Sequence, residues 1–136
     1  ANVGQTFDED RYFWSRPSAA GYNAAGSAGS NKGPSNPDYL AQVQARLDTF
    51  LVHHQGVSRG QVPADMVTAS GSGLDPDISP QAARVQAARV ARVRKLPEAR
   101  VRELVEQHVK GPWLGLFGPS RVNVLELNLA LDQLKN

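Results

Sequence analysis

Two polar residue–proline pairs fix where helices can begin in this chain. Asn36 precedes Pro37, and Ser79 precedes Pro80. Asn and Ser are good helix N-caps, and proline suits the first helical position because its missing N–H would have no partner there. Apolar residues then recur at helical spacing, which predicts a helix from about Pro37 to His53. Its expected buried stripe consists of Leu40, Val43, Leu47, Phe50 and Leu51.

The residues that follow Ser79 predict two further helices. The first runs from Pro80 to about Lys95 and is built mostly from Ala, Arg, Val and Gln, which favour helix. The second starts near Pro97 and ends at Gly111, where a following proline prevents continuation.

The remaining elements are short. Alternating residues predict a strand over Asp65–Ala69, and the apolar run at 113–117 predicts a second strand. Asn123 followed three residues later by Glu126 resembles a capping box, which favours a helix over a strand in the last segment. The expected fold class is therefore α+β, a small single-domain fold with about four helices and a short few-stranded sheet.

Domain organisation follows from length and composition. The chain has 136 residues, which suits one ordinary domain over residues 1–136. Residues 1–36 are expected to form a loop region rich in Gly, Ser, Ala and Asn, and residues 37–136 the core of helices and strands. By composition alone this N-terminal region fits either a flexible linker or a packed loop, with a lean towards the linker.

Composition excludes several classes of function. The chain has no cysteine, so disulfides, cysteine-rich zinc sites and thiol nucleophiles are excluded. Its net charge of +2 is too weak to indicate a nucleic-acid partner, and we expect none. We also expect no catalytic residue and no metal site. The sequence holds no apolar run long enough to span a membrane. It starts at Ala1 and not at Met, so we expect an N-terminal piece to have been removed.

The stretch VTASGSGLDPDISP, residues 67–80, is the strongest candidate for chemistry. A phosphate-binding P-loop needs a lysine that is missing here, and neither serine has the flanking glycines of a nucleophile elbow. We therefore expect a tight turn leading into a helix, shaped by Ser70, Gly71, Ser72, Gly73 and Asp75. An alternative is a nucleotide-binding module that uses the Ser70–Gly73 loop and the following helix N-terminus.

The helix after Ser79 carries several cations without an acid between them. Arg84, Arg89 and Arg92 form a candidate basic surface, although such cations spread around much of an ideal helix. The simpler interpretation is a solvated flank that pairs with acids elsewhere.

Three strings in one order resemble the KdpC family, the C subunit of the bacterial potassium-transporting Kdp ATPase. They are YFWSRPSAAGYNAAGSAGSNKGPSNP, VTASGSGLDPDISP and RVNVLELNLALD. The resemblance implies a non-hydrolysing accessory subunit, which works beside a P-type subunit that hydrolyses ATP and a channel-like subunit that conducts potassium. It also implies one N-terminal transmembrane helix, absent from this chain, and a soluble domain, which this chain represents.

The resemblance carries further expectations. The subunit would support assembly and raise the ATP affinity of the P-type subunit, with no tightly bound cofactor and ATP reached only through that subunit. It would sit at the bacterial plasma membrane with its soluble domain on the extracytoplasmic side. The family block over residues 16–36 makes an ordered loop the better expectation there, with Arg16, Asn23, Asn31 and Asn36 as candidate interaction residues.

This chain departs from the family pattern at two places. Asp77 stands where the family often has His, and we expect its carboxylate in the first turn of the helix that follows. Ala87 and Ala88 stand where the family often has Val-Pro, so we expect this helix to run unbroken.

Overall fold

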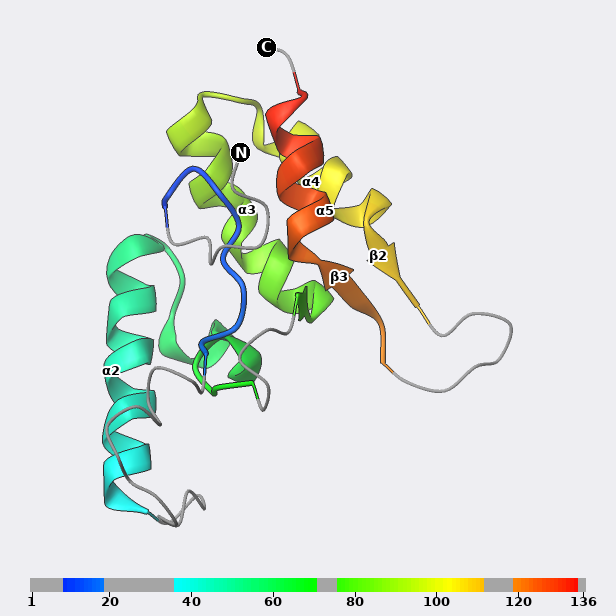
Figure 1. Cartoon of the computed structure of the whole chain (residues 1–136). Coiled ribbons are helices and arrows are strands. Elements are labelled where there is room, and N and C mark those ends of the chain that lie inside the picture. The colour runs from blue at the N-terminus through cyan, green and yellow to red at the C-terminus, as the bar shows by residue number, and fades with distance from the viewer. Residues whose placement is uncertain (1–8, 19–35, 71–75, 112–118, 135–136) are drawn as a thin grey trace.

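The computed structural model describes residues 9–18, 36–70, 76–111 and 119–134 (Figure 1). Within these ranges four α-helices and one three-stranded antiparallel sheet form an α+β fold, which confirms the predicted class. The helices are α2 (Pro37–His53), α3 (Pro80–Arg94), α4 (Glu98–Gln107) and α5 (Val124–Asp132). The strands are β1 (Asp77–Ile78), β2 (Val109–Lys110) and β3 (Arg121–Asn123). No helix in the described ranges has both the length and the apolar character needed to cross a bilayer.

The predicted caps start the helices. The Asn36 side chain accepts a hydrogen bond from the backbone N–H of Asp38 at 2.9 Å. Ser79 Oγ accepts one from the N–H of Ala82 at 3.0 Å, and Asn123 starts α5 in the same way. Each cap satisfies an N–H group that has no partner inside its own helix. The helix starts were therefore predicted correctly.

The sheet is small and has β3 at its centre, in the order β1-β3-β2. β3 pairs antiparallel with both neighbours and runs directly into α5 (Figure 1). Asp77 lies in β1, opposite Asn123, and its carboxylate lies 3.3 Å from Arg121 Nε. The expected place of Asp77 in the first turn of α3 is therefore wrong, because this residue belongs to the strand that precedes the Ser79 cap. α3 itself runs unbroken through positions 87 and 88, as expected.

The core lies among α3, α4, α5 and β3 and is built mainly from aliphatic side chains. Its fully buried members include Ile78, Val90, Val101, Val105, Val122, Leu127 and Leu131. Tyr12 and Phe13 also belong to it, although the sequence predicted the core in residues 37–136. The N-terminal arm, defined here as residues 9–18, is thus part of the packed structure.

α2 packs less closely than its sequence pattern predicts. Only Phe50 of its expected stripe is buried, with 2 % of its surface exposed, whereas Leu40 is 50 % exposed. Figure 1 shows α2 at the edge of the molecule, with the arm between it and α3. The helical period identified the apolar positions correctly, but apolar spacing alone does not show what covers them.

The strand expected over Asp65–Ala69 is wrong. Residues Ala64–Met66 form a short 3₁₀ turn, in which Met66 N–H donates to the Pro63 carbonyl at 3.0 Å. The following turn is reinforced by Thr68 Oγ1, which donates to the Ala64 carbonyl at 2.9 Å. Such local side-chain bonds compete with strand pairing. The strand expected at 113–117 lies outside the described residues.

Candidate interaction site

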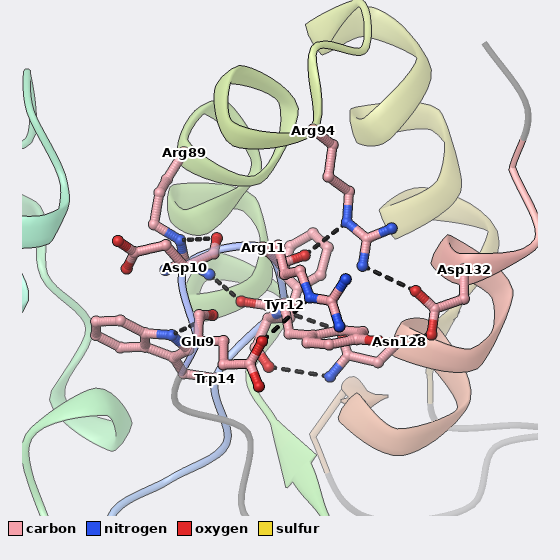
Figure 2. A network of polar contacts seen from close by, with 10 residues as sticks. Glu9, Asp10, Arg11, Tyr12, Trp14, Arg89, Arg94, Asn128 and Asp132 are labelled. Carbon is pink, nitrogen blue, oxygen red and sulfur yellow. Dashed lines mark hydrogen bonds and ion pairs between the residues drawn. The ribbon is translucent and has the colours of Figure 1, made fainter. Parts of the chain in front are cut away.

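Two side-chain amides hold the N-terminal arm against the helices. Asn128 of α5 accepts from Phe13 N–H at 2.9 Å and donates to Phe13 O at 3.0 Å (Figure 2). Gln86 of α3 accepts from Trp14 N–H at 2.7 Å and donates to Trp14 O at 3.2 Å. Both amides are buried. They take the place of a neighbouring strand, because the buried backbone groups of the arm need partners.

Arg89 is the central cation of this arrangement and is only 1 % exposed. Its guanidinium donates to the Asp10 carbonyl at 2.9 Å and to the Tyr12 carbonyl, and lies 4.6 Å from the centre of the Trp14 ring (Figure 2). Burial lowers the pKa of Arg89 to about 10, so the side chain stays protonated at neutral pH. The prediction that Arg89 forms part of a basic surface is wrong, because α3 directs it inward onto the arm.

The other two cations of that predicted surface lie apart from Arg89. Arg84 makes a bidentate ion pair with Glu106 of α4, with N–O distances of 2.7 and 2.9 Å. Arg92 is exposed. The three arginines therefore form no common surface, and Arg84 is a solvated flank paired with an acid, as the simpler interpretation held.

Two further residues fasten the arm to α3 and α5. The Tyr12 hydroxyl donates to an Asp132 carboxylate oxygen at 2.7 Å. Arg94 donates to the other carboxylate oxygen at 2.9 Å and to the Arg11 carbonyl at 2.6 Å (Figure 2). The arm is thus held at Asp10–Trp14 by polar groups from two helices.

His54 closes the network from the α2 side. Its Nδ1 lies 2.7 Å from the Phe50 carbonyl and its Nε2 lies 2.5 Å from Arg89 Nη1. A carbonyl oxygen only accepts hydrogen bonds, so Nδ1 carries the proton and Nε2 accepts from Arg89. Burial lowers the pKa of His54 to about 4, and the charges of Arg89 and His53 lower it further. The hydrogen bond to the Phe50 carbonyl and the charge of Asp10 act in the opposite direction but are outweighed.

We expect the chain to become less stable as the pH is lowered, because of His54. Its pKa is lower in the folded state than the ordinary value of 6.5, so the folded chain favours the neutral ring. The contribution is complete above pH 6.5 and is lost as the pH falls towards 4, by up to about 3 kcal/mol. Urea unfolding at several pH values measures it. The His54→Gln variant, which has no titrating ring, should lose less stability over this window; equal losses in both proteins would contradict the assignment.

Arg16, predicted as an interaction residue, fixes the chain just before the glycine-rich stretch. Its Nη2 donates to the carbonyls of Thr68 and Ala69, both at 3.3 Å, and to Thr68 Oγ1 at 3.2 Å. One guanidinium therefore holds the end of the 64–69 segment against the arm.

Ser70 meets the arm directly. Its N–H donates to the Pro17 carbonyl at 3.0 Å, and Ser18 and Ser70 form a single parallel bridge. Ser70 is 2 % exposed, so it is an anchored residue. The structure thus brings Arg16 and Ser70 together, whereas Asn36 lies elsewhere, as the cap of α2. Other predicted site residues lie outside the described residues: Gly71, Ser72, Gly73, Asp75, Asn23 and Asn31.

The N-terminus of α3 is already occupied by a carboxylate. Asp65 accepts from Ser79 N–H at 2.7 Å and from Ser79 Oγ at 3.0 Å. An anion at this end of a helix is favourable, but a second anion such as a phosphate would be repelled. This position therefore does not favour nucleotide binding at the start of α3.

A cleft of about 380 Å³ lies between the arm and α2. Its described lining combines apolar groups with two cations and contains no carboxylate: Trp14, Ser15, Arg16, Pro17, Ser18, Gln42, Ala45, Arg46, Thr49, Phe50 and Met66. Arg46 donates to the Val67 carbonyl at 3.2 Å, so backbone acceptors fix both guanidinium groups. In the described part of the chain, no group of three or more His, Cys, Asp or Glu side chains is placed to hold a metal ion.

Sequence reasoning missed Gln86, Asn128 and the cleft. A signal for Asn128 was present, because it shares the apolar face of its helix with Val124 and Leu131. A polar residue on such a face needs a buried partner. The partner is a backbone segment 115 residues away in the chain, and the residues around Asn128 do not indicate which segment it is.

Comparisons with known proteins agree along nearly the whole chain. A sequence profile described as "KdpC: K+-transporting ATPase, c chain" matches residues 1–133. The potassium-transporting ATPase KdpC subunit of Bacteroides fragilis is 62 % identical over 138 residues, covering 100 % of this chain and 72 % of that protein. The KdpC subunit of Flavobacterium psychrophilum is 62 % identical, covering 98 % of this chain and 71 % of that protein. The KdpC subunit of Polaromonas naphthalenivorans is 57 % identical, covering 98 % of this chain and 69 % of that protein.

Proposed function

The chain belongs to the KdpC family of potassium-transporting ATPase subunits, and on that basis we propose that it is the accessory, non-hydrolysing subunit of an ATP-driven potassium uptake complex. In this role it supports assembly of the complex. The observation that carries the proposal is the match along residues 1–133 together with identities near 60 %.

The proposed partners are the P-type subunit that hydrolyses ATP and the channel-like subunit that conducts potassium. We propose further that the chain raises the ATP affinity of the P-type subunit through protein contacts. Two observations support contact through a partner over direct nucleotide binding. The carboxylate of Asp65 lies at the α3 N-terminus, and the N–H of Ser70 is used by Pro17.

A chimeric subunit tests the proposal. The matching 72 % of the Bacteroides fragilis subunit is replaced by this chain, and the chimera is expressed in a strain that lacks its own KdpC subunit. We expect growth at low potassium to be restored, and the tagged chimera to copurify with the other subunits. A chimera that is produced in normal amounts but restores no growth and recruits no subunit would overturn the proposal.

We propose the extracytoplasmic side of the bacterial plasma membrane for this domain, and cysteine labelling tests it. The chain has no cysteine, so Gln55→Cys at an exposed position introduces a single thiol into a cysteine-free chimera. A membrane-impermeant maleimide should label this thiol in intact spheroplasts. Labelling that occurs only after lysis would place the domain on the cytoplasmic side.

A further inference from the structure

We infer that His54 is a pH-sensitive latch for α2: protonation of its ring releases α2 from the arm and from α3, while α3, α4, α5 and the sheet stay folded. The latch is defined here as the contact between His54 and Arg89. The inference does not depend on the proposed function. It adds a conformational response to acid, which the proposed extracytoplasmic position would expose to the pH outside the cell.

α2 is the helix that the rest of the described chain holds least firmly. Of its own residues only Phe50 is buried, whereas α3, α4 and α5 each bury several side chains. Figure 1 shows α2 at the edge of the molecule, apart from the group formed by α3, α4 and α5. Elements with few buried contacts open at a lower free energy than the whole domain. Release of α2 is therefore expected before the core unfolds.

Two residues one helical turn apart fasten the end of α2. The rings of Phe50 and His54 are stacked with 3.8 Å between their centres. Each ring packs edge-on against Trp14 of the arm, at 6.0 Å for Phe50 and 5.1 Å for His54. His54 also reaches α3, because its Nε2 accepts a hydrogen bond from Arg89. The same ring thus joins α2 to both the arm and α3.

Protonation of His54 turns this attraction into repulsion. Nδ1 already carries a proton for the Phe50 carbonyl, so a second proton adds to Nε2. Two N–H donors and two positive charges then face each other at a buried site, because Arg89 stays protonated. Arg89 is fixed by the carbonyls of Asp10 and Tyr12. The repulsion is therefore relieved by movement of His54, and of α2 with it.

Three charged or titratable groups of the described chain face His54. Arg89 from α3 and His53 from α2 both disfavour a charged His54 ring, whereas Asp10 from the arm favours it. Asp10 also lies 2.8 Å from His53 Nδ1, so a protonated His53 attracts the arm and opposes the release of α2. The side chains of this pair are 36 and 46 % exposed, and such solvated pairs contribute little. The buried contact with Arg89 therefore decides the direction of the response.

The size of the response follows from the two environments of the ring. Burial lowers the pKa of His54 to about 4 while α2 is docked, and the pKa returns towards 6.5 when the ring reaches water. The docked state is favoured fully above pH 6.5, and this advantage is lost as the pH falls towards 4. Between pH 7.5 and pH 5 the ratio of undocked to docked chains should rise roughly 30-fold.

Energy transfer between two dyes measures the release. The chain has no cysteine, so Gln44→Cys on α2 and Gln107→Cys on α4 attach one dye each at exposed positions. The matched control pair, Gln107→Cys with Leu129→Cys on α5, reports on the core. Urea favours states that expose more surface, so urea titrations bring the undocked state into view. At pH 5 we expect the α2 pair to separate at a lower urea concentration than the core pair, and at a lower one than at pH 7.5.

Two histidine variants assign the response. Gln does not titrate, so the urea midpoint of the α2 pair in His54→Gln should be the same at both pH values. His53→Gln keeps the latch and removes its titrating neighbour, so its midpoint should fall at least as far as in the parent. The inference is overturned if the α2 midpoint of the parent does not change with pH, or coincides with the core midpoint at pH 5. A parent-like fall in His54→Gln, or no fall in His53→Gln, overturns it as well.

Discussion

Replacing Arg89 with Met is expected to lower the free energy of unfolding by about 2–6 kcal/mol, because two buried acceptors lose their donor at about 1–3 kcal/mol each. These acceptors are the Tyr12 carbonyl and His54 Nε2. The cation also lies against the Trp14 ring, so its packing contribution is lost as well. Urea unfolding at neutral pH measures the change, and limited proteolysis should show faster cleavage within residues 9–18.

Arg92→Met is the matched control for this substitution. Arg92 is on the same helix and is exposed, so its loss should change the free energy of unfolding by no more than about 0.5 kcal/mol. Arg89→Met should also weaken the pH dependence assigned to His54, because the neighbouring positive charge is removed. Equal effects of the two substitutions would show that the buried guanidinium does not hold the arm.

The second large effect is expected at Asn128. Asn128→Leu keeps the approximate size of the side chain but removes both hydrogen bonds to the Phe13 backbone. Two buried backbone groups are then left without partners, which is expected to cost about 2–5 kcal/mol.

Gln107→Leu serves as the control for Asn128→Leu. It makes the same kind of change to an exposed amide at the end of α4 and should leave stability within about 0.5 kcal/mol of the parent. Unfolding measurements on the two variants compare them directly. If Asn128→Leu is as stable as Gln107→Leu, the amide pairing does not contribute to holding the arm.

The parts of the fold that local chemistry determines were predictable from the sequence. A helix start depends on residues within one turn, so Asn36, Ser79 and Asn123 identified three starts correctly. The short strands were not predictable in the same way, because β1 has two residues and exists only through its pairing with β3. A periodic pattern cannot be recognised over two residues.

The contacts of the arm were beyond the reach of local patterns. Gln86 and Asn128 meet backbone groups 72 and 115 residues away in the chain. Arg89 shows how a partial signal can be overlooked: it follows Gln86 by three residues and precedes Val90, both buried, so helical spacing already placed it near the inner face. The number of arginines gives the charge of the helix but does not show which of them are buried. The position of each arginine around the helix axis separates the buried Arg89 from the exposed Arg92.

The most direct test of the central claim is potassium-stimulated ATP hydrolysis by the purified complex. A complex that contains the chimeric subunit is expected to hydrolyse ATP in response to potassium, with a higher affinity for ATP than the same preparation without any KdpC subunit. The isolated chain is expected to hydrolyse none. ATP hydrolysis by the isolated chain, or equal activity and ATP affinity with and without the chimeric subunit, would contradict the account.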